Sequence, residues 1–323
     1  MQPDTVPEPR TTPLDPEAPI RGEVRLSGHR RVSHGLYLPI VSNRSVDEET
    51  LRELRAWLLV LPGDAVFTHV TAARLNGWWL PKLPEFVPVF AATQLDNNRP
   101  RRPGLICSRL DRAPDPVDRL GLPVDSGDEI LLRTSRDVAL LDLVPMVESA
   151  IRLGHVSGPQ IRDICGTRRP GSRVLRHAFA LADPRSESTW ETHLRLFHQL
   201  AGIPVEPQRD LYTEDGRFIG RGDLLIKGTH FVQEYDGADH RQPNQHTKDL
   251  RRDRRFADTP FVRRGYTADD LLNHDAAVLQ EIDRFLGRRF RFSRLGRWRR
   301  LVAESTYSDE GRARLQNRWL RTG

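Results

Sequence analysis

The stretch RGDLLIKGTHFVQEYDGADH, residues 221–240, decides the fold of the C-terminal half of the chain. Two short apolar runs flank the tetrapeptide KGTH, a pattern typical of two strands joined by a turn. Asp223, Glu234 and Asp236 lie in these runs, where a buried strand normally carries apolar side chains. A buried carboxylate without a partner costs several kcal/mol, so these acids need cations, hydrogen bonds or an exposed strand end.

The segments around this hairpin predict an αβββαβα order. Before the hairpin we expect a helix beginning near Ser188 and ended by Gly202 and Pro204, and then a first strand in QRDLY. After it we expect a charged helix over 248–257, a strand in FVRRGY, and a helix capped by Thr267 that runs to about Leu286. Such an order gives a mixed sheet, with antiparallel hairpins first and then a helical crossover to a parallel strand.

The N-terminal half predicts an α-rich α+β domain. EVRLSGHRRVSHGLYLPI suggests a hairpin around Ser27-Gly28, Ser45 should cap an amphipathic helix, and FVPVFAA and GLICSRL read as strands. The run from Arg133 to Leu153 is expected to be helical, with Pro145 as a kink or break. ADPRSES, residues 182–188, is the expected seam between the two halves. The predicted organisation is a disordered tail over 1–20, an N-terminal domain over 21–184, a second domain over 185–287 and an Arg-rich tail over 288–323.

Composition limits the classes of function. The 323-residue chain has a net charge of +6, and nearly all of its basic residues are arginine, which favours an anionic partner such as nucleic acid. Cys107 and Cys165 lack a CxxC partner and are expected to be reduced thiols. No apolar stretch is long enough for a membrane span, and the Pro-rich N-terminus does not resemble a signal peptide, so we expect a cytoplasmic protein.

A divalent metal is one explanation of the carboxylates. Strand alternation places Glu234 and Asp236 on one face, and the short turn brings Asp223 beside them. Oxygen-only ligands suit Mg²⁺, with Mn²⁺ as an alternative, better than Zn²⁺. The other explanation is a solvated sheet edge, or ion pairs to Arg221 and Arg252.

From Ser188 to about Leu272 the chain resembles the PD-(D/E)XK nuclease superfamily, most closely its very-short-patch-repair (Vsr)-like branch. The resemblance rests on the following ordered elements: Glu191, Gly222-Asp223, EYDG at 234–237, His240, the D-x-x-R at 249–252 and VRRGYTADDLL from Val262. It implies a restriction-endonuclease-like fold that hydrolyses DNA phosphodiester bonds with a metal ion.

Carried over by position, the resemblance makes Asp223 the central metal ligand and Glu234 the second. The superfamily has a lysine two residues after the second ligand, whereas this chain has Asp236. The lysine's role in activating water must fall elsewhere, or activity is lost. His240 is the preferred replacement, because imidazole exchanges protons near neutral pH, and Lys248 is a second candidate.

Two further residues have alternative roles. Glu191 follows Ser188 at the spacing of a capping box, so it either caps the first helix of the domain or belongs to the metal shell. Arg252 is either a phosphate clamp or a counter-ion of the carboxylates.

The segment from about Gly22 to Leu153 resembles AbiEi-like antitoxin-type proteins. RRVSHGLYLPI, AVFTHVTAARLNGWW and RTSRDVALLDLV carry this resemblance, which implies a cognate toxin or another defence protein as a partner. The helix-turn-helix that normally precedes the HGLYLP wing is not evident, so only part of a winged helix is expected. We expect His69 and Trp78-Trp79 to have core and cap roles rather than chemical ones.

The C-terminal segment places arginines among aromatic residues. Arg288, Arg289 and Arg291 are candidate phosphate contacts, with the aromatic rings available for stacking on bases; a solvated or partner-docking helix is the alternative. The sequence therefore predicts a Mg²⁺-dependent DNA endonuclease in bacterial defence, mobile-element or repair functions. The alternative is a DNA-binding or antitoxin-like regulator whose nuclease site has degenerated.

Overall fold

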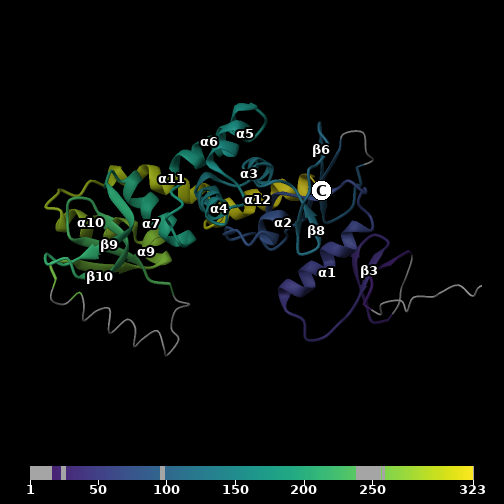
Figure 1. Cartoon of the computed structure of the whole chain (residues 1–323), viewed down its shortest axis with the longest axis horizontal. Helices are drawn as coiled ribbons and strands as arrows, with labels where there is room; N and C mark the ends of the chain where they lie inside the picture. Colours follow the sequence, from purple (N-terminus) through teal and green to yellow (C-terminus); the bar gives the residue numbers. More distant parts are fainter. Residues whose placement is uncertain (1–16, 23–26, 95–98, 238–255, 257–258, 323) are drawn as a thin grey trace, which may run out of the picture. The chain divides into compact units, whose positions relative to one another are not determined.

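A computed structural model describes residues 17–22, 27–94, 99–237, 256 and 259–322. The expected disordered tail, His240, Lys248, Arg252 and the charged helix over 248–257 lie almost entirely outside these ranges. The chain forms two compact units, an N-terminal unit of residues 1–67 with 88–123 and a C-terminal unit of residues 68–87 with 124–322 (Figure 1). The expected seam at 182–188 falls inside the C-terminal unit.

The N-terminal unit begins with a small antiparallel sheet of order β1-β3-β2, made of β1 (Ile20–Arg21), β2 (His29–Ser33) and β3 (Leu36–Pro39). Ser33 pairs with Leu36, so His34 and Gly35 form the turn between β2 and β3. Gly35 has φ +63°, which glycine adopts without the strain of a side chain. The expectation of a hairpin around Ser27-Gly28 was therefore wrong in position: that pair precedes β2.

Helix α1 (Val46–Leu58) follows, and its predicted start is confirmed. Ser45 and Glu48 form a capping box, because Ser45 Oγ accepts from the Glu48 N–H and the Glu48 carboxylate accepts from the Ser45 N–H. The helix is followed by a sheet of order β6-β5-β4-β8-β7. Its strands are β4 (Val66–Phe67), β5 (Val89–Gln94), β6 (Leu105–Leu110), β7 (Val117–Arg119) and β8 (Leu122–Val124), and the predicted strands β5 and β6 pair in parallel.

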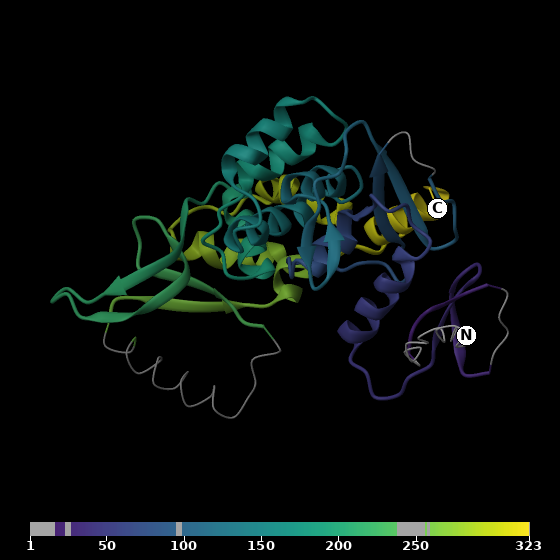
Figure 2. The ribbon, with the colours of Figure 1, turned by 45° about the vertical axis from the view of Figure 1, so that its right-hand side comes forward.

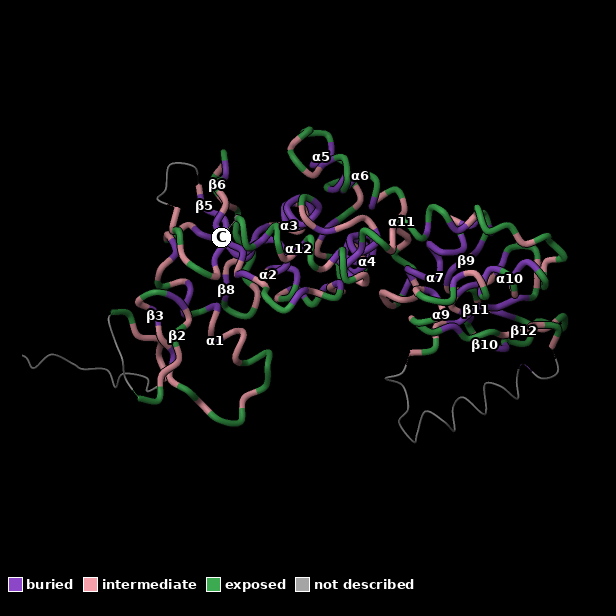
Figure 3. Tube along the Cα trace, turned by 180° about the vertical axis from the view of Figure 1, so that it is seen from behind, coloured by how far each residue is buried: buried purple, intermediate pink, exposed green. Residues whose placement is uncertain are grey.

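Helices dominate the first part of the C-terminal unit. They are α2 (His69–Leu75), α3 (Gly127–Thr134), α4 (Leu140–Arg152), α5 (Gly158–Gly166) and α6 (Ser172–Leu181). Helix α4 is buried along nearly its whole length (Figure 3). Trp78 is buried, as expected of a core residue, and its Nε1 donates to His155 Nδ1 at 2.8 Å.

The helix expected over 133–153 is interrupted at residues 135–139, and Pro145 lies inside α4. Of the expected kink or break at Pro145, the break was wrong, because another helix compensates for the missing hydrogen bond. Proline lacks the N–H that would bond the carbonyl of Leu141, four residues earlier. His193 Nε2 donates to that carbonyl at 3.3 Å, so α7 (Thr189–Leu200) supplies the missing hydrogen bond.

The predicted mixed sheet follows α7, shown in green in Figure 2. Its order is β12-β11-β10-β9, with β9 (Val205–Tyr212), β10 (Phe218–Ile226) and β11 (Phe231–Tyr235) antiparallel and β12 (Val262–Tyr266) parallel to β11. Thr267 caps the next helix as predicted, but that helix is two, α9 (Ala268–Asn273) and α10 (Asp275–Phe285), separated at His274. The mixed α+β class expected from the sequence is thus confirmed.

Residues 288–323 had been expected to form a tail, and this was wrong. The segment contains the 3₁₀ helix η2 (Phe292–Leu295) and helices α11 (Gly296–Glu304) and α12 (Asp309–Thr322). The side chains of Trp298 and Trp319 are fully buried, and Trp298 Nε1 donates to the Leu271 carbonyl at 2.9 Å. Several arginines of the segment form ion pairs within the unit, including Arg294 with Asp283. No helix in the described ranges combines the length and the apolar character that crossing a membrane requires.

Candidate active site

Asp223 and Glu234 occupy neighbouring positions on adjacent strands. The β10–β11 ladder pairs Leu224 with Gln233, so the residues one step further along the same register are Asp223 and Glu234. Asp223 Oδ2 accepts a hydrogen bond from the Tyr235 N–H at 3.1 Å. This bond ties the carboxylate of β10 to the backbone of β11, directly beside Glu234.

Glu234 has a cationic partner that the sequence did not suggest. Its side chain is 8% exposed, and its carboxylate accepts from the guanidinium of Arg263 on β12. The Arg263 guanidinium also lies 4.8 Å from the centre of the Phe256 ring. Arg221, the counter-ion considered from the sequence, instead pairs with Asp210 at 2.7 Å on the neighbouring strand.

Asp236 follows directly after β11 and is exposed. Its N–H donates to the Tyr266 carbonyl at 2.9 Å, which extends the parallel pairing by one bond. Its carboxylate lies over Gly265, since a Cβ placed there would collide with it. The Asp236 carboxylate thus occupies the space that a side chain at position 265 would take.

The Glu191 carboxylate accepts hydrogen bonds at the N-terminus of α7. Its Oε2 accepts from the Glu187 N–H at 2.7 Å and from Gln208 Nε2 at 2.8 Å, while its Oε1 accepts from the Ser188 hydroxyl at 3.1 Å. Burial raises the pKa of this carboxyl, and these hydrogen bonds oppose the rise. Gln208 has φ +52° on β9, so a left-handed backbone conformation accompanies its contact with Glu191. The geometry accounts for Glu191 as a cap that also links α7 to β9.

Aromatic and polar contacts hold α7 against β11. The rings of Trp190 and Tyr235 are stacked, with centres 5.5 Å apart and planes 8° from parallel. His198, which is fully buried, lies 3.3 Å from Gln233 through its Nε2. Burial lowers the pKa of His198 to about 4, so this imidazole is neutral at pH 7. These contacts with α7 hold β11, the strand that carries Glu234, in place.

The donor chemistry of Asp223 and Glu234 fits a magnesium ion. Mg²⁺ is usually bound by one or two carboxylates together with water and substrate phosphates, rather than by a complete protein cage. Among the described residues, no group of three or more His, Cys, Asp or Glu side chains could hold a metal ion. A cation at Glu234 would share this carboxylate with Arg263 or displace it.

The structure brings together some of the predicted residues. Asp223 and Glu234 lie side by side on β10 and β11, Asp236 follows β11 with its carboxylate over Gly265 of β12, and Glu191 caps the helix that packs on this sheet. His240, Lys248 and Arg252 are outside the described ranges, and Arg288, Arg289 and Arg291 are exposed after α10. Arg263 and Gln208 were missed, although the parallel pairing of FVRRGY with FVQEY was a signal that could have placed Arg263 near Glu234.

Comparison with models of known families, with curated proteins and with solved structures finds no match to this chain.

Proposed function

We propose that this chain is a metal-dependent endonuclease that hydrolyses phosphodiester bonds of DNA, in bacterial defence, mobile-element or repair functions. The observation that carries the proposal is the position of Asp223 beside Glu234 on adjacent strands of a mixed sheet, with the Tyr235 N–H holding the Asp223 carboxylate. The order of elements, a helix followed by three antiparallel strands and a parallel fourth, supports a restriction-endonuclease-like fold with a Vsr-like arrangement.

Asp223 and Glu234 would hold Mg²⁺, with Mn²⁺ as an alternative. The bound ion would polarise the scissile phosphate and lower the pKa of a water molecule. The hydrogen bond from Tyr235 orients Asp223, and Arg263 would balance the charge of Glu234 while the site is empty. His240 would accept a proton from the attacking water or donate one to the leaving oxygen, and Lys248 and Arg252 would contact DNA phosphates.

The test compares Asp223→Ala with Asp210→Asn, a change at an exposed acid on the neighbouring strand. Asp223→Ala should abolish Mg²⁺-dependent nicking of plasmid DNA and the heat of Mg²⁺ binding in calorimetry. Asp210→Asn should keep both. Equal nicking by wild type and Asp223→Ala would reject the proposal.

A regulator with a degenerate nuclease site is the second candidate. Two observations favour it: Glu234 already has a cationic partner in Arg263, and an acid occupies the position of the superfamily lysine. Such a protein would bind DNA, a cognate toxin or another defence protein, and it would not cleave DNA. Calorimetry separates the candidates, because a degenerate site should give no Mg²⁺ heat that depends on Asp223.

A further inference from the structure

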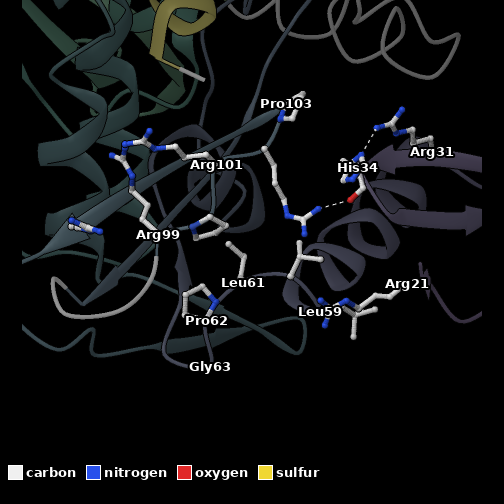
Figure 4. A pocket seen from close by; sticks show the side chains of 14 residues that line it. Arg21, Arg31, His34, Leu59, Leu61, Pro62, Gly63, Arg99, Arg101 and Pro103 are labelled. Atoms are coloured by element: carbon white, nitrogen blue, oxygen red, sulfur yellow. Dashed lines mark hydrogen bonds between the residues drawn. The ribbon is translucent and has the colours of Figure 1, made fainter. Parts of the chain in front are cut away.

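The N-terminal unit contains an open groove of about 1280 Å³, which we call the arginine groove. It is formed by β1, β2, the chain that follows α1 (residues 59–63) and the connection into β6. Figure 4 shows Arg99 and Arg101 on one side and Arg21 and Arg31 on the other. Six arginines line it: Arg21, Arg31, Arg99, Arg101, Arg102 and Arg109.

The groove concentrates positive charge. None of the described lining residues is acidic, and the six arginines together equal the net charge of +6 of the whole chain. Arg102 donates to the His34 carbonyl, and Arg31 Nη2 lies 3.2 Å from His34 Nδ1, which fixes two of the guanidinium groups at the hairpin turn. Arg21, Arg31, Arg101 and Arg109 are exposed.

Three arginines elsewhere in this unit, Arg30, Arg44 and Arg52, are paired with glutamates. Arg30 pairs with Glu49 and Glu53, and Arg52 pairs with Glu49. Within the described ranges, none of the six groove arginines forms an ion pair with a carboxylate. Like charges brought together without counter-ions repel each other, so this arrangement is best explained by an anionic ligand.

We infer that the arginine groove binds the sugar-phosphate backbone of a nucleic acid duplex, independently of sequence. Small-molecule pockets are typically about 300–1,000 Å³, concave and mostly apolar, whereas this groove is larger, open and cationic. Phe, Tyr and Trp are missing from its described lining, so it offers no platform for stacking single-stranded bases. Guanidinium groups on two sides of an open groove can donate hydrogen bonds to several phosphates along a nucleic acid backbone.

This inference does not require the proposed nuclease activity, because no groove residue belongs to the carboxylate site. It should therefore be tested with full-length Asp223→Ala protein in EDTA, where a labelled duplex is not cleaved. Binding is measured by fluorescence anisotropy over a series of salt concentrations. The groove variant is Arg21→Gln with Arg101→Gln and Arg109→Gln. The control variant, which has the same change of charge, is Arg55→Gln with Arg162→Gln and Arg173→Gln, exposed positions outside the groove.

The groove variant should bind the duplex at least tenfold more weakly than the parent at moderate salt. The slope of log K against log salt should fall by about 2–3, since each phosphate contact contributes roughly 0.9. The control variant should keep affinity within about twofold and keep the slope. An unchanged slope in the groove variant, or an equal loss in the control variant, would overturn the inference.

Replacement of the same three groove arginines by lysine separates charge from folding. The lysine variant should retain most of the affinity and the salt slope, because it retains the charge. A loss as large as that of the glutamine variant would reject binding by phosphate neutralisation. Vesicles of phosphatidylserine and phosphatidylcholine provide the final comparison: if they bind the protein through these arginines and the duplex does not, the ligand is a membrane surface and the inference is wrong.

Discussion

Arg263 on β12 donates to the carboxylate of Glu234 on the neighbouring parallel strand β11, and both side chains are largely shielded from water, with 22% and 8% exposed. Removing the cationic partner of a buried carboxylate is strongly destabilising, because it leaves an unpaired charge in the interior. Arg263→Gln should therefore lower the free energy of unfolding by about 2–4 kcal/mol, measured by urea denaturation. Saturating Mg²⁺ should restore part of this loss if Glu234 is a metal ligand, because ligand binding to the native state stabilises it.

Arg264→Gln is the matched control for this first prediction. Arg264 is the next residue on the same strand and pairs with Glu281, but its side chain is 53% exposed. An exposed pair contributes about 1 kcal/mol or less, and Mg²⁺ should have no differential effect on this variant. If Mg²⁺ stabilises wild type, Arg263→Gln and Arg264→Gln to the same extent, Glu234 does not bind the ion.

Glu191 is expected to be a structural cap and not a metal ligand. Its two carboxylate oxygens accept from Glu187, Ser188 and Gln208, all at or beside the start of α7. Glu191→Ala should lower stability by about 1 kcal/mol, as the loss of a helix cap does, and should leave the heat of Mg²⁺ binding unchanged. Ser188→Ala provides the comparison, since the two losses should be less than additive. Loss of the Mg²⁺ heat in Glu191→Ala alone would assign this residue to the metal site.

The sequence predicted the order of the C-terminal sheet because the relevant signals are local. Strand alternation, the turn residues and the caps at Ser188 and Thr267 each act within a few residues, and the structure has all of them. Arg263 was missed because its importance comes from a parallel pairing between segments about 30 residues apart. The arginine groove was missed for the same reason, since its lining comes from four separated parts of the chain.

The C-terminal segment shows a different failure of prediction. The aromatic residues among its arginines suggested stacking on bases, because the sequence alone does not show whether a ring is buried. In the structure, the tryptophans are buried while Arg294 and Arg299 reach carboxylates on α10. The identity of these partners could not be read from the spacing of the arginines, because it depends on tertiary packing.

The contact between His193 and the Leu141 carbonyl should be replaceable by a backbone hydrogen bond. His193→Leu leaves this buried carbonyl without its donor, because Pro145 has no N–H, and should lower stability by about 1–3 kcal/mol. Adding Pro145→Ala restores an N–H four residues after Leu141 and should recover much of this loss. Thermal unfolding of the two single variants and the double variant completes the cycle. Strict additivity of the two changes would refute the exchange of donors.

Stability should carry a pH-dependent contribution from Asp142. Burial raises the pKa of this carboxyl from 3.8 to about 6, although the Ser305 hydroxyl and the Thr306 N–H both donate to it. The folded state therefore binds the proton more tightly than the unfolded state. Protonation of Asp142 therefore stabilises the folded state. This stabilisation, about 3 kcal/mol, is fully present below about pH 4 and is lost as the pH rises through about 6.

Comparison with Asp142→Asn isolates this contribution from the histidines, which act in the opposite direction. Burial lowers the pKa of His193 to about 4, so its contribution is lost as the pH falls from about 6.5 towards 4. The difference in unfolding free energy between wild type and Asp142→Asn should change by about 3 kcal/mol between pH 4 and 7. Two parallel stability curves would show that Asp142 titrates normally.

Arg288, Arg289 and Arg291 can be tested only by point substitution. Deleting residues 288–323 would remove Trp298 and Trp319, which are fully buried, and loss of such a side chain costs about 3–5 kcal/mol. Replacing the three exposed arginines by glutamine should leave stability within about 0.5 kcal/mol. If they contact phosphates, the salt slope of duplex binding should fall by about 2–3.

Arg294→Gln is the control variant. It should lower stability and keep the salt slope, because the Arg294 guanidinium is bound to Asp283 and to the Ala201 carbonyl. A triple variant with an unchanged slope would remove these arginines from the DNA-binding surface.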